Sequence, residues 1–422
     1  MCRPWMILGC CVLSCGLWGV PPAAGQFVDG EWVQRGEASI RKYRMTNAAF
    51  LVLDAEGKLA ADAEVRLEQE AHAFRLGWAL RDRFPEAYDP TGELWRVFNE
   101  VSLKGLTSWR DVQPDADGVL RSDAIRAALD AAEEAGLSVH WGNLLSAEPF
   151  DLPEWVVPLR GQALYYAALA YALEVADTFG PRIDGLDLCD RLPAEDDPRF
   201  SAAMLRLIEA HLNAGLPGVE SRLRVDGAWQ SDRASAALGA MDVAANEQLG
   251  RDGFSASDRF PPRAVAQDQI EPALRRIAKV GRPLRITGLE VGGTHGIETT
   301  VNVETVVRTL FAEPSVTGIT FAGLGPSDFA DASATLIDEQ GQPTGAGLVL
   351  DRLFRTVWWS DETTRTDELG RAQTRVFLGD YTVTATLADG ATVSMPLRLR
   401  ERDDSPEPII LMPVKAGGAG AD

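Results

Sequence analysis

Cysteine is scarce in this chain, and its distribution leaves little room for disulfide bonds. The sequence holds five cysteines, and four of them lie within the first 25 residues: Cys2, Cys10, Cys11 and Cys15. If those residues are removed, Cys189 stands alone and no internal bridge can form. We interpret Cys189 as a small buried apolar residue.

Histidine is also rare, and its spacing excludes the common metal motifs. The four histidines are His72, His140, His211 and His295, and no two are spaced as His-x-x-x-His. The glycine-rich stretch at Gly292-Gly293 does not form the Gly-x-Gly-x-x-Gly pattern that binds a nucleotide. We therefore expect no metal, no other cofactor and no nucleotide.

Basic residues are outnumbered, 41 against 62 acidic residues, which gives a net charge of −21. Such a charge repels the phosphates of nucleic acids and anionic membrane surfaces. The composition therefore argues against a nucleic-acid partner, and we expect a monomer.

The first 25 residues have the pattern of a signal peptide. Arg3 precedes the mostly apolar run Met6–Val20, and small residues lead up to a cleavage site after Gly25. The run is too short for a convincing membrane span. We expect a periplasmic or secreted chain that begins near Gln26. A lipoprotein attached through Cys15 is the alternative, disfavoured by the short segment before that residue.

Both ends of the remaining chain predict β structure. Residues 26–75 include the strand candidate 49–53 and the alternating segment 63–67, which indicates a sandwich-like domain. Residues 361–413 include two alternating runs joined at Asp389-Gly390, typical of a hairpin. We expect the tail, 414–422, to be disordered.

Residues 76–360 alternate short apolar runs with helical segments, which predicts an α/β fold, a (β/α)8 TIM barrel. The predicted strands are Leu76–Leu80, Val101–Leu106, Val139–Leu145, Ile183–Leu188, Arg222–Asp226, Asp242–Asn246, Leu284–Leu289 and Val316–Phe321. In this fold the chemistry lies at the carboxyl-terminal ends of the strands.

A series of short motifs in this region occurs in a recognisable order. They are Phe74-Arg-Leu-Gly-Trp-Ala79, Phe98-Asn99 through Trp109, Pro153-Glu-Trp155, Leu186-Asp-Leu-Cys-Asp-Arg191 and Ile286-Thr287. Together they resemble glycoside hydrolase family 10, the endo-β-1,4-xylanases. The resemblance implies the barrel fold and a polysaccharide or oligosaccharide partner such as β-1,4-xylan.

The same resemblance implies that the catalytic carboxylates are missing. Gly288 stands where the family has its nucleophile and Arg191 where it has its acid/base. A retaining glycosidase needs both carboxylates, about 5–5.5 Å apart. Asp190 and Glu290, near the ends of the same two strands, are the acids that could replace them, although solvated loop acids are the simpler interpretation.

Other residues near predicted strand ends are candidates for substrate binding. Trp109, Trp141 and Trp155 could stack on sugar rings, or could pack in the core. Asp187 corresponds to a supporting Asp of the family. His295 follows the seventh strand, where barrels often build sites, and turn formation explains it equally well.

These observations lead to three hypotheses. The first is an exported, xylanase-like barrel that binds carbohydrate and is catalytically inactive or very weak. The second is an active glycoside hydrolase on a β-1,4-glycan that uses the displaced carboxylates Asp190 and Glu290. The third is a structural or protein-binding component of the cell envelope.

Overall fold

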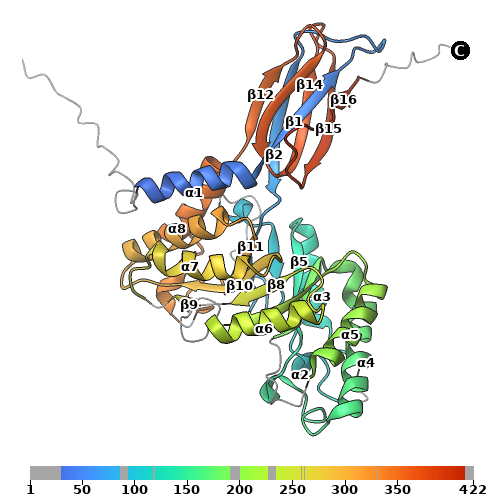
Figure 1. Ribbon diagram of the computed structural model, residues 1–422, viewed down its shortest axis with the longest axis vertical. Coiled ribbons are helices and arrows are strands. Elements are labelled where there is room, and N and C mark those ends of the chain that lie inside the picture. Colours follow the sequence, from blue (N-terminus) through green and yellow to red (C-terminus); the bar gives the residue numbers. More distant parts are fainter. Residues whose placement is uncertain are drawn as a thin grey trace, which may run out of the picture.

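The structure is a computed structural model that describes residues 30–85, 94–116, 119–190, 200–226, 234–257, 259–260, 262–329 and 331–413. The predicted signal peptide, Arg191 and the predicted tail lie outside the described residues. The chain folds into a barrel and a β unit that meet at one end of the barrel (Figure 1).

Eight parallel strands close the barrel, as the sequence predicts. They are β3 (Arg75–Ala79), β4 (Glu100–Ser102), β5 (Ser138–Leu145), β6 (Gly185–Cys189), β7 (Glu220–Asp226), β8 (Phe254–Ser257), β10 (Leu284–Val291) and β11 (Val316–Phe321). Each pairs with the next, and β11 returns to β3. The short β9 (Arg259–Phe260) pairs with the end of β10.

Helices lie in most of the connections between successive strands and after the last one, and they cover the outside of the barrel. They are α2 (Trp109–Val112), α3 (Asp123–Glu134), α4 (Gly161–Phe179), α5 (Ala202–Gly215), α6 (Ala234–Asn246), α7 (Gln267–Ala278), α8 (Gly296–Ala312) and α9 (Gly345–Arg352). None of the helices in the described part of the chain is long and apolar enough to cross a bilayer.

The sixth strand differs from the prediction. Residues 242–246 form the end of helix α6, and the strand is β8, a few residues later. The helix is rich in alanine, the best helix former, so the apolar residues around Met241 belong to a helix face. Glycines with positive φ at Gly250 and Gly253 turn the chain from α6 into β8.

The interior of the barrel is polar, whereas the outer faces of its strands are apolar. On β5, for example, His140 contacts Asp187 of β6 across the interior, while the next residue, Trp141, packs on Phe179 of helix α4. Neighbouring residues of a strand point to opposite faces. The apolar core therefore lies between the barrel and its helices.

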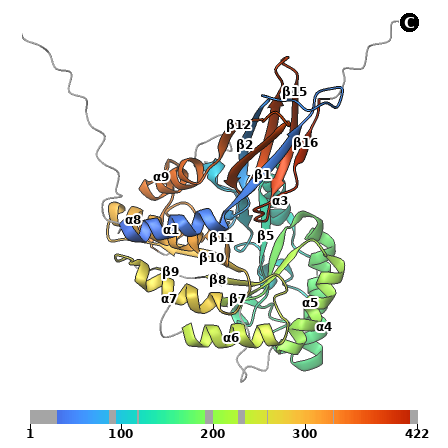
Figure 2. The same ribbon diagram turned by 45° about the horizontal axis from the view of Figure 1, so that its top comes forward.

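The β unit combines strands from both ends of the chain (Figure 2). One sheet has the order β13 (Arg371–Phe377), β1 (Met45–Val52), β16 (Ile409–Leu411), and the other β12 (Asp361–Arg365), β2 (Glu64–His72), β14 (Gly379–Thr386), β15 (Thr392–Leu399). A separate buried apolar cluster, which includes Phe50, Val65 and Val383, holds the two sheets together. The predicted hairpin is β14–β15.

The β unit is attached to the face of the barrel where the strands begin. Strand β2 ends at His72 and strand β3 starts at Arg75. Helix α1 (Gly30–Tyr43), which the sequence did not predict, lies along α8, and Ser39 Oγ donates a hydrogen bond to the carbonyl of Ala312 at 2.6 Å. The opposite face of the barrel, where the strands end, is left clear of the β unit (Figure 1).

Candidate functional site

We call the carboxyl-terminal ends of the barrel strands the barrel mouth. Strands β6, β7, β8 and β10 are consecutive neighbours in the barrel, so residues at their ends lie along one side of the mouth. This arrangement places Asp190, Gly288 and Glu290 at the mouth, in the region where a barrel carries its chemistry. Arg191 lies outside the described residues.

Gly288 interrupts strand β10 with an unusual backbone conformation. Its φ is +72°, and the pairing of β10 with β11 shifts register between Thr287 and Leu289. This is a bulge, and the left-handed conformation favours glycine because a side chain would clash with the backbone. The strand then continues to Val291.

A side chain at position 288 would lie beside a basic residue. A Cβ atom built on Gly288 lies 3.7 Å from Nζ of Lys104, which follows strand β4. It also lies 3.6 Å from Cβ of Ser257 on β8. Oγ of Ser257 accepts a hydrogen bond from Arg224 on β7 at 2.6 Å. The surroundings of Gly288 at the mouth thus include two cationic side chains.

Asp187 lies inside the barrel and is fixed by its neighbours. Its Oδ1 accepts a hydrogen bond from Ser255 Oγ at 2.5 Å and lies 3.4 Å from Nε2 of His140. Burial acts to raise the pKa of Asp187, but His140, Ser255 and Arg224 outweigh it and lower that pKa to about 2. Asp187 is therefore ionised near neutral pH and is held by these contacts.

Asp190 and Glu290, the two acids that the sequence analysis names as candidates, each hold a loop. Asp190 accepts hydrogen bonds from Ser146 Oγ at 2.5 Å and from the amide of Ala147 at 2.9 Å. Glu290 Oε1 accepts a hydrogen bond from the amide of Asp331 at 2.9 Å and lies 3.3 Å from Nε of Arg259. Both residues are only 8% exposed.

The predicted tryptophans occupy two environments. Trp141 is fully buried under α4, and Trp109 is stacked on Tyr171 with ring centroids 4.7 Å apart, which fits the core-packing alternative. Trp155 is half-buried, and its ring meets the edge of Trp109. Only Trp155 among these three leaves part of its surface to solvent.

His295 belongs to the start of a helix. Its Nδ1 accepts a hydrogen bond from the amide of Glu298 at 3.2 Å, so it caps helix α8. This is the role that Ser, Asp or Asn usually fill at the first turn of a helix. The side chain therefore has a structural function on the loop after β10.

Sequence reasoning missed Phe150 in the loop after strand β5. Phe150 lies in the helical turn η3 (Pro149–Asp151) and is 64% exposed. The same loop is held by Asp190 through Ser146, whose Oγ also lies 3.1 Å from Oδ2 of Asp151. An aromatic residue just after Glu148-Pro149 at a predicted strand end was the available signal.

No metal site is evident: across the described ranges, no group of three or more His, Cys, Asp or Glu side chains could hold an ion. The acids at the mouth are engaged with amides, hydroxyls and arginines.

The closed eight-stranded barrel with its outer helices defines this chain as a (β/α)8 barrel. Solved structures with similar folds include glycoside hydrolase family 10 xylanases. Xylanase 10B from Thermotoga petrophila, in complex with xylobiose, has a TM-score of 0.57 and 16% identity, over 68% of this chain and 95% of that one.

An intracellular xylanase from Thermoanaerobacterium saccharolyticum, in a mutant complex with xylotriose, has a TM-score of 0.56 and 15% identity. The match covers 67% of this chain and 98% of that one. A psychrophilic family 10 endo-β-1,4-xylanase has a TM-score of 0.55 and 12% identity, over 66% of this chain and 96% of that one. At these identities the likeness is one of fold. No family model matches the chain, and no curated protein matches its sequence.

Proposed function

We propose that this protein binds a polysaccharide or oligosaccharide at the barrel mouth and hydrolyses xylan weakly or not at all. The observation that carries the proposal is Gly288, a residue without a carboxylate, in a left-handed bulge at the strand where the sequence resemblance expects the nucleophile. The fold similarity to xylanases crystallised with xylobiose and xylotriose supports a carbohydrate as the ligand.

The proposed lack of activity follows from the residues at positions 288 and 191. A retaining glycosidase passes through a covalent intermediate on one carboxylate while a second one donates and accepts a proton. Glycine supplies no nucleophile, and arginine at position 191 keeps its proton near neutral pH. General acid catalysis alone contributes about 10²–10⁴-fold, so its loss together with the nucleophile predicts little residual rate.

The displaced-acid alternative has less support. Asp190 and Glu290 both accept hydrogen bonds from backbone amides, and these contacts fix loops rather than leave a carboxylate ready for a sugar. The Glu290→Gln and Asp190→Asn variants test this alternative. If either variant lost a hydrolytic activity that the wild type possessed, while still folded, the second hypothesis would replace the first.

The binding surface that we propose includes Phe150 and Trp155. Both follow strand β5, and both leave part of an aromatic ring open to solvent. Aromatic faces stack on the apolar faces of sugar rings and contribute about 0.5–1.5 kcal/mol in comparable contacts. We expect Phe150→Ala to weaken binding of a xylo-oligosaccharide by roughly two- to tenfold.

The experiment combines calorimetry with xylo-oligosaccharides, a glycan array and a reducing-sugar assay on xylan. Tyr166→Ala is the matched control, because Tyr166 is an exposed aromatic residue on the outer helix α4, 57% exposed. Hydrolysis at rates like those of the xylanases would refute inactivity. Binding to no glycan would support the third hypothesis, an envelope component that uses the β unit.

We also propose export, with cleavage after Gly25 and a mature chain that begins near Gln26. The support is the apolar leader and the small residues before the cleavage site. Mass spectrometry of the protein from its native host tests this directly. An intact Met1, or a lipid on Cys15, would contradict the proposal.

A further inference from the structure

A cavity of about 330 Å³ lies where the β unit meets the barrel, on the face where the strands begin. We call it the junction cavity. Its walls come from the end of β2, from the helical turn η2 (Trp95–Val97) and the residues up to β4, from the turn between α3 and β5, and from the π-helical turn η6 (Leu353–Val357). The volume is at the lower end of the range for small-molecule sites, which suits a ligand of one or two rings.

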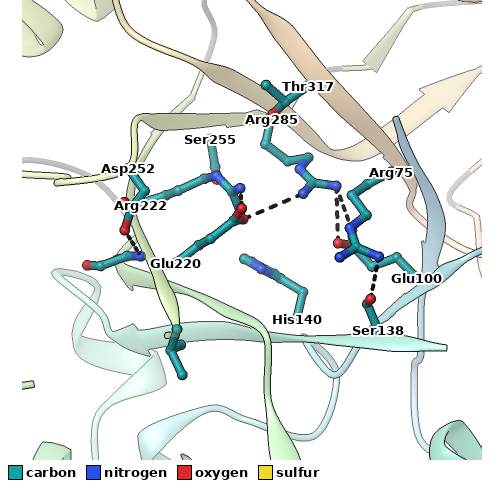
Figure 3. A network of polar contacts seen from close by, with 12 residues as sticks. Arg75, Glu100, Ser138, His140, Glu220, Arg222, Asp252, Ser255, Arg285 and Thr317 are labelled. Atoms are coloured by element: carbon teal, nitrogen blue, oxygen red, sulfur yellow. Dashed lines mark hydrogen bonds and ion pairs between the residues drawn. The ribbon is translucent and has the colours of Figure 1, made fainter. Parts of the chain in front are cut away.

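The junction cavity is separate from the barrel mouth. Its walls include the residues directly before β4 and β5, so it adjoins the starts of these strands. Beyond them, towards the mouth, polar side chains fill the barrel interior (Figure 3). Arg285 pairs there with Glu100 at 3.1 Å, and Arg75 donates a hydrogen bond to Ser138. A ligand in the junction cavity therefore contacts groups that a ligand at the mouth does not.

The lining of the junction cavity has a buried apolar part and an exposed polar part. Its buried apolar side chains include Trp95, Phe98, Leu137 and Phe354. Its charged side chains lie on the solvent side and are the exposed Glu70 and Arg96 and the half-buried Arg355. An amphipathic ligand, with apolar faces and polar edges, matches this lining.

The charges around the junction cavity balance. Arg96 and Arg355 supply two positive charges. Glu70 in the lining and Asp351, whose charge acts on Arg355, supply two negative ones. His72, the remaining titratable group of the lining, is neutral near pH 7 because burial lowers its pKa to about 4. Glu70 would repel an anion and the two arginines would repel a cation, so the electrostatics favour a neutral ligand.

The solvent side of the junction cavity offers both hydrogen-bond donors and acceptors. The guanidinium of Arg355 lies over the ring of Trp359, with Cζ 3.8 Å from the ring centroid. Stacking engages a flat face of the guanidinium and leaves the N–H groups in its plane able to donate. Thr382 donates a hydrogen bond to Oε1 of Glu70, and a carboxylate has about four acceptor positions in all. Hydroxyl groups, which both donate and accept, suit this combination.

We propose that the junction cavity binds one or two rings of a neutral saccharide. The apolar C–H faces of the rings pack on Trp95 and Phe98. Their hydroxyl groups accept hydrogen bonds from Arg96 and Arg355 and donate to Glu70. This is a second carbohydrate site, and it does not depend on whether the mouth binds a glycan.

The experiment titrates the full chain and its variants with xylobiose and with cellobiose in a calorimeter. Arg96→Ala and Glu70→Ala should each weaken one class of site roughly tenfold or more, because each removes a charge-assisted hydrogen bond, and both side chains are exposed enough for the variants to fold. Arg398→Ala, at a side chain that is 81% exposed in the β unit, is the control and should bind like the wild type. Phe150→Ala, at the mouth, should leave the junction cavity unchanged.

A crystal soaked in xylobiose provides the location. Density in the junction cavity, together with weaker binding by both variants in solution, supports the proposal. Density without any change in Arg96→Ala and Glu70→Ala means binding at crystal concentration only and overturns it. An effect of Phe150→Ala alone supports the mouth and overturns the second site, and binding of neither sugar by the wild type overturns both. Tighter binding of D-glucuronate than of D-glucose, lost in Arg96→Ala, would mean an anion site and would overturn the assignment of a neutral ligand.

Discussion

His72 lies at the junction of the β unit and the barrel, and its environment favours the neutral imidazole. The ring is surrounded by Phe311, Phe354, Trp359 and Phe377, with centroids 5.5–6.2 Å away. Nε2 donates to the carbonyl of Phe354 at 3.0 Å, which leaves Nδ1 to accept from Gln69 Nε2 at 3.3 Å. A second proton on the ring would face that amide donor.

Burial lowers the pKa of His72 to about 4, and the charges of Arg355 and Arg44 act in the same direction. Because the folded pKa lies below the unfolded one, the unfolded chain binds more protons, and stability falls as the pH falls from about 6.5 towards 4. With about 6.5 in the unfolded chain, linkage predicts a loss of about 2 kcal/mol between pH 7 and pH 5.

Urea unfolding followed by tryptophan fluorescence at pH 7 and pH 5 measures this loss. We expect His72→Gln to be less stable than the wild type at pH 7, but to lose about 2 kcal/mol less between the two pH values. His211→Gln is the control, because His211 is exposed on α5 and its removal should leave the difference unchanged. A pH dependence of His72→Gln equal to that of the wild type would refute the reasoning.

Two further predictions concern buried carboxylates. Glu100→Gln should destabilise the protein by about 3–5 kcal/mol, because it leaves Arg285 without its buried partner, whereas Asp380→Asn, at a partly exposed ion pair, should cost at most about 1 kcal/mol. Equal shifts of the urea midpoint in Glu100→Gln and Asp380→Asn would contradict the burial of the Glu100–Arg285 pair. Asp187, whose pKa is lowered to about 2, should stabilise the fold by about 2–3 kcal/mol at pH 7, a contribution lost as the pH falls from about 5 to 2. In acid unfolding, Asp187→Asn should not lose this contribution to stability as the pH falls. An acid transition of the variant like that of the wild type would show that the pKa of Asp187 is not lowered.

The fold was predictable where an element had a long, consistent pattern. Strand β11 has the bounds that the sequence predicts, Val316–Phe321. Strand β8 has only four residues, too few for a periodic signal, and the sequence instead predicts a strand at 242–246, which lies in the alanine-rich helix α6. The high helix propensity of the alanines in α6 outweighs the strand signal of its apolar residues.

The candidate site was predictable in position but not in orientation. The spacing along strands placed Gly288, Asp190 and Glu290 at the mouth, because all parallel strands end on one face. The strand pattern did not say which of His140 and Trp141 faces the interior, because both faces of a barrel strand are covered. The partners of the two acids, Ser146 and Asp331, lie on distant loops, and only the folded structure brings them together.

The environment of Gly288 bears on how far this chain lies from an active hydrolase. Its left-handed φ means that Gly288→Glu costs about 1–2 kcal/mol of backbone strain before any chemistry is gained. The new carboxylate would lie next to Lys104, which favours the ionised form that a nucleophile needs. Under the proposed function it would still lack a partner, because the arginine at position 191 keeps its proton near neutral pH. Under the proposed function, activity therefore requires a carboxylate at both positions 191 and 288, because neither change alone gains what retaining hydrolysis demands.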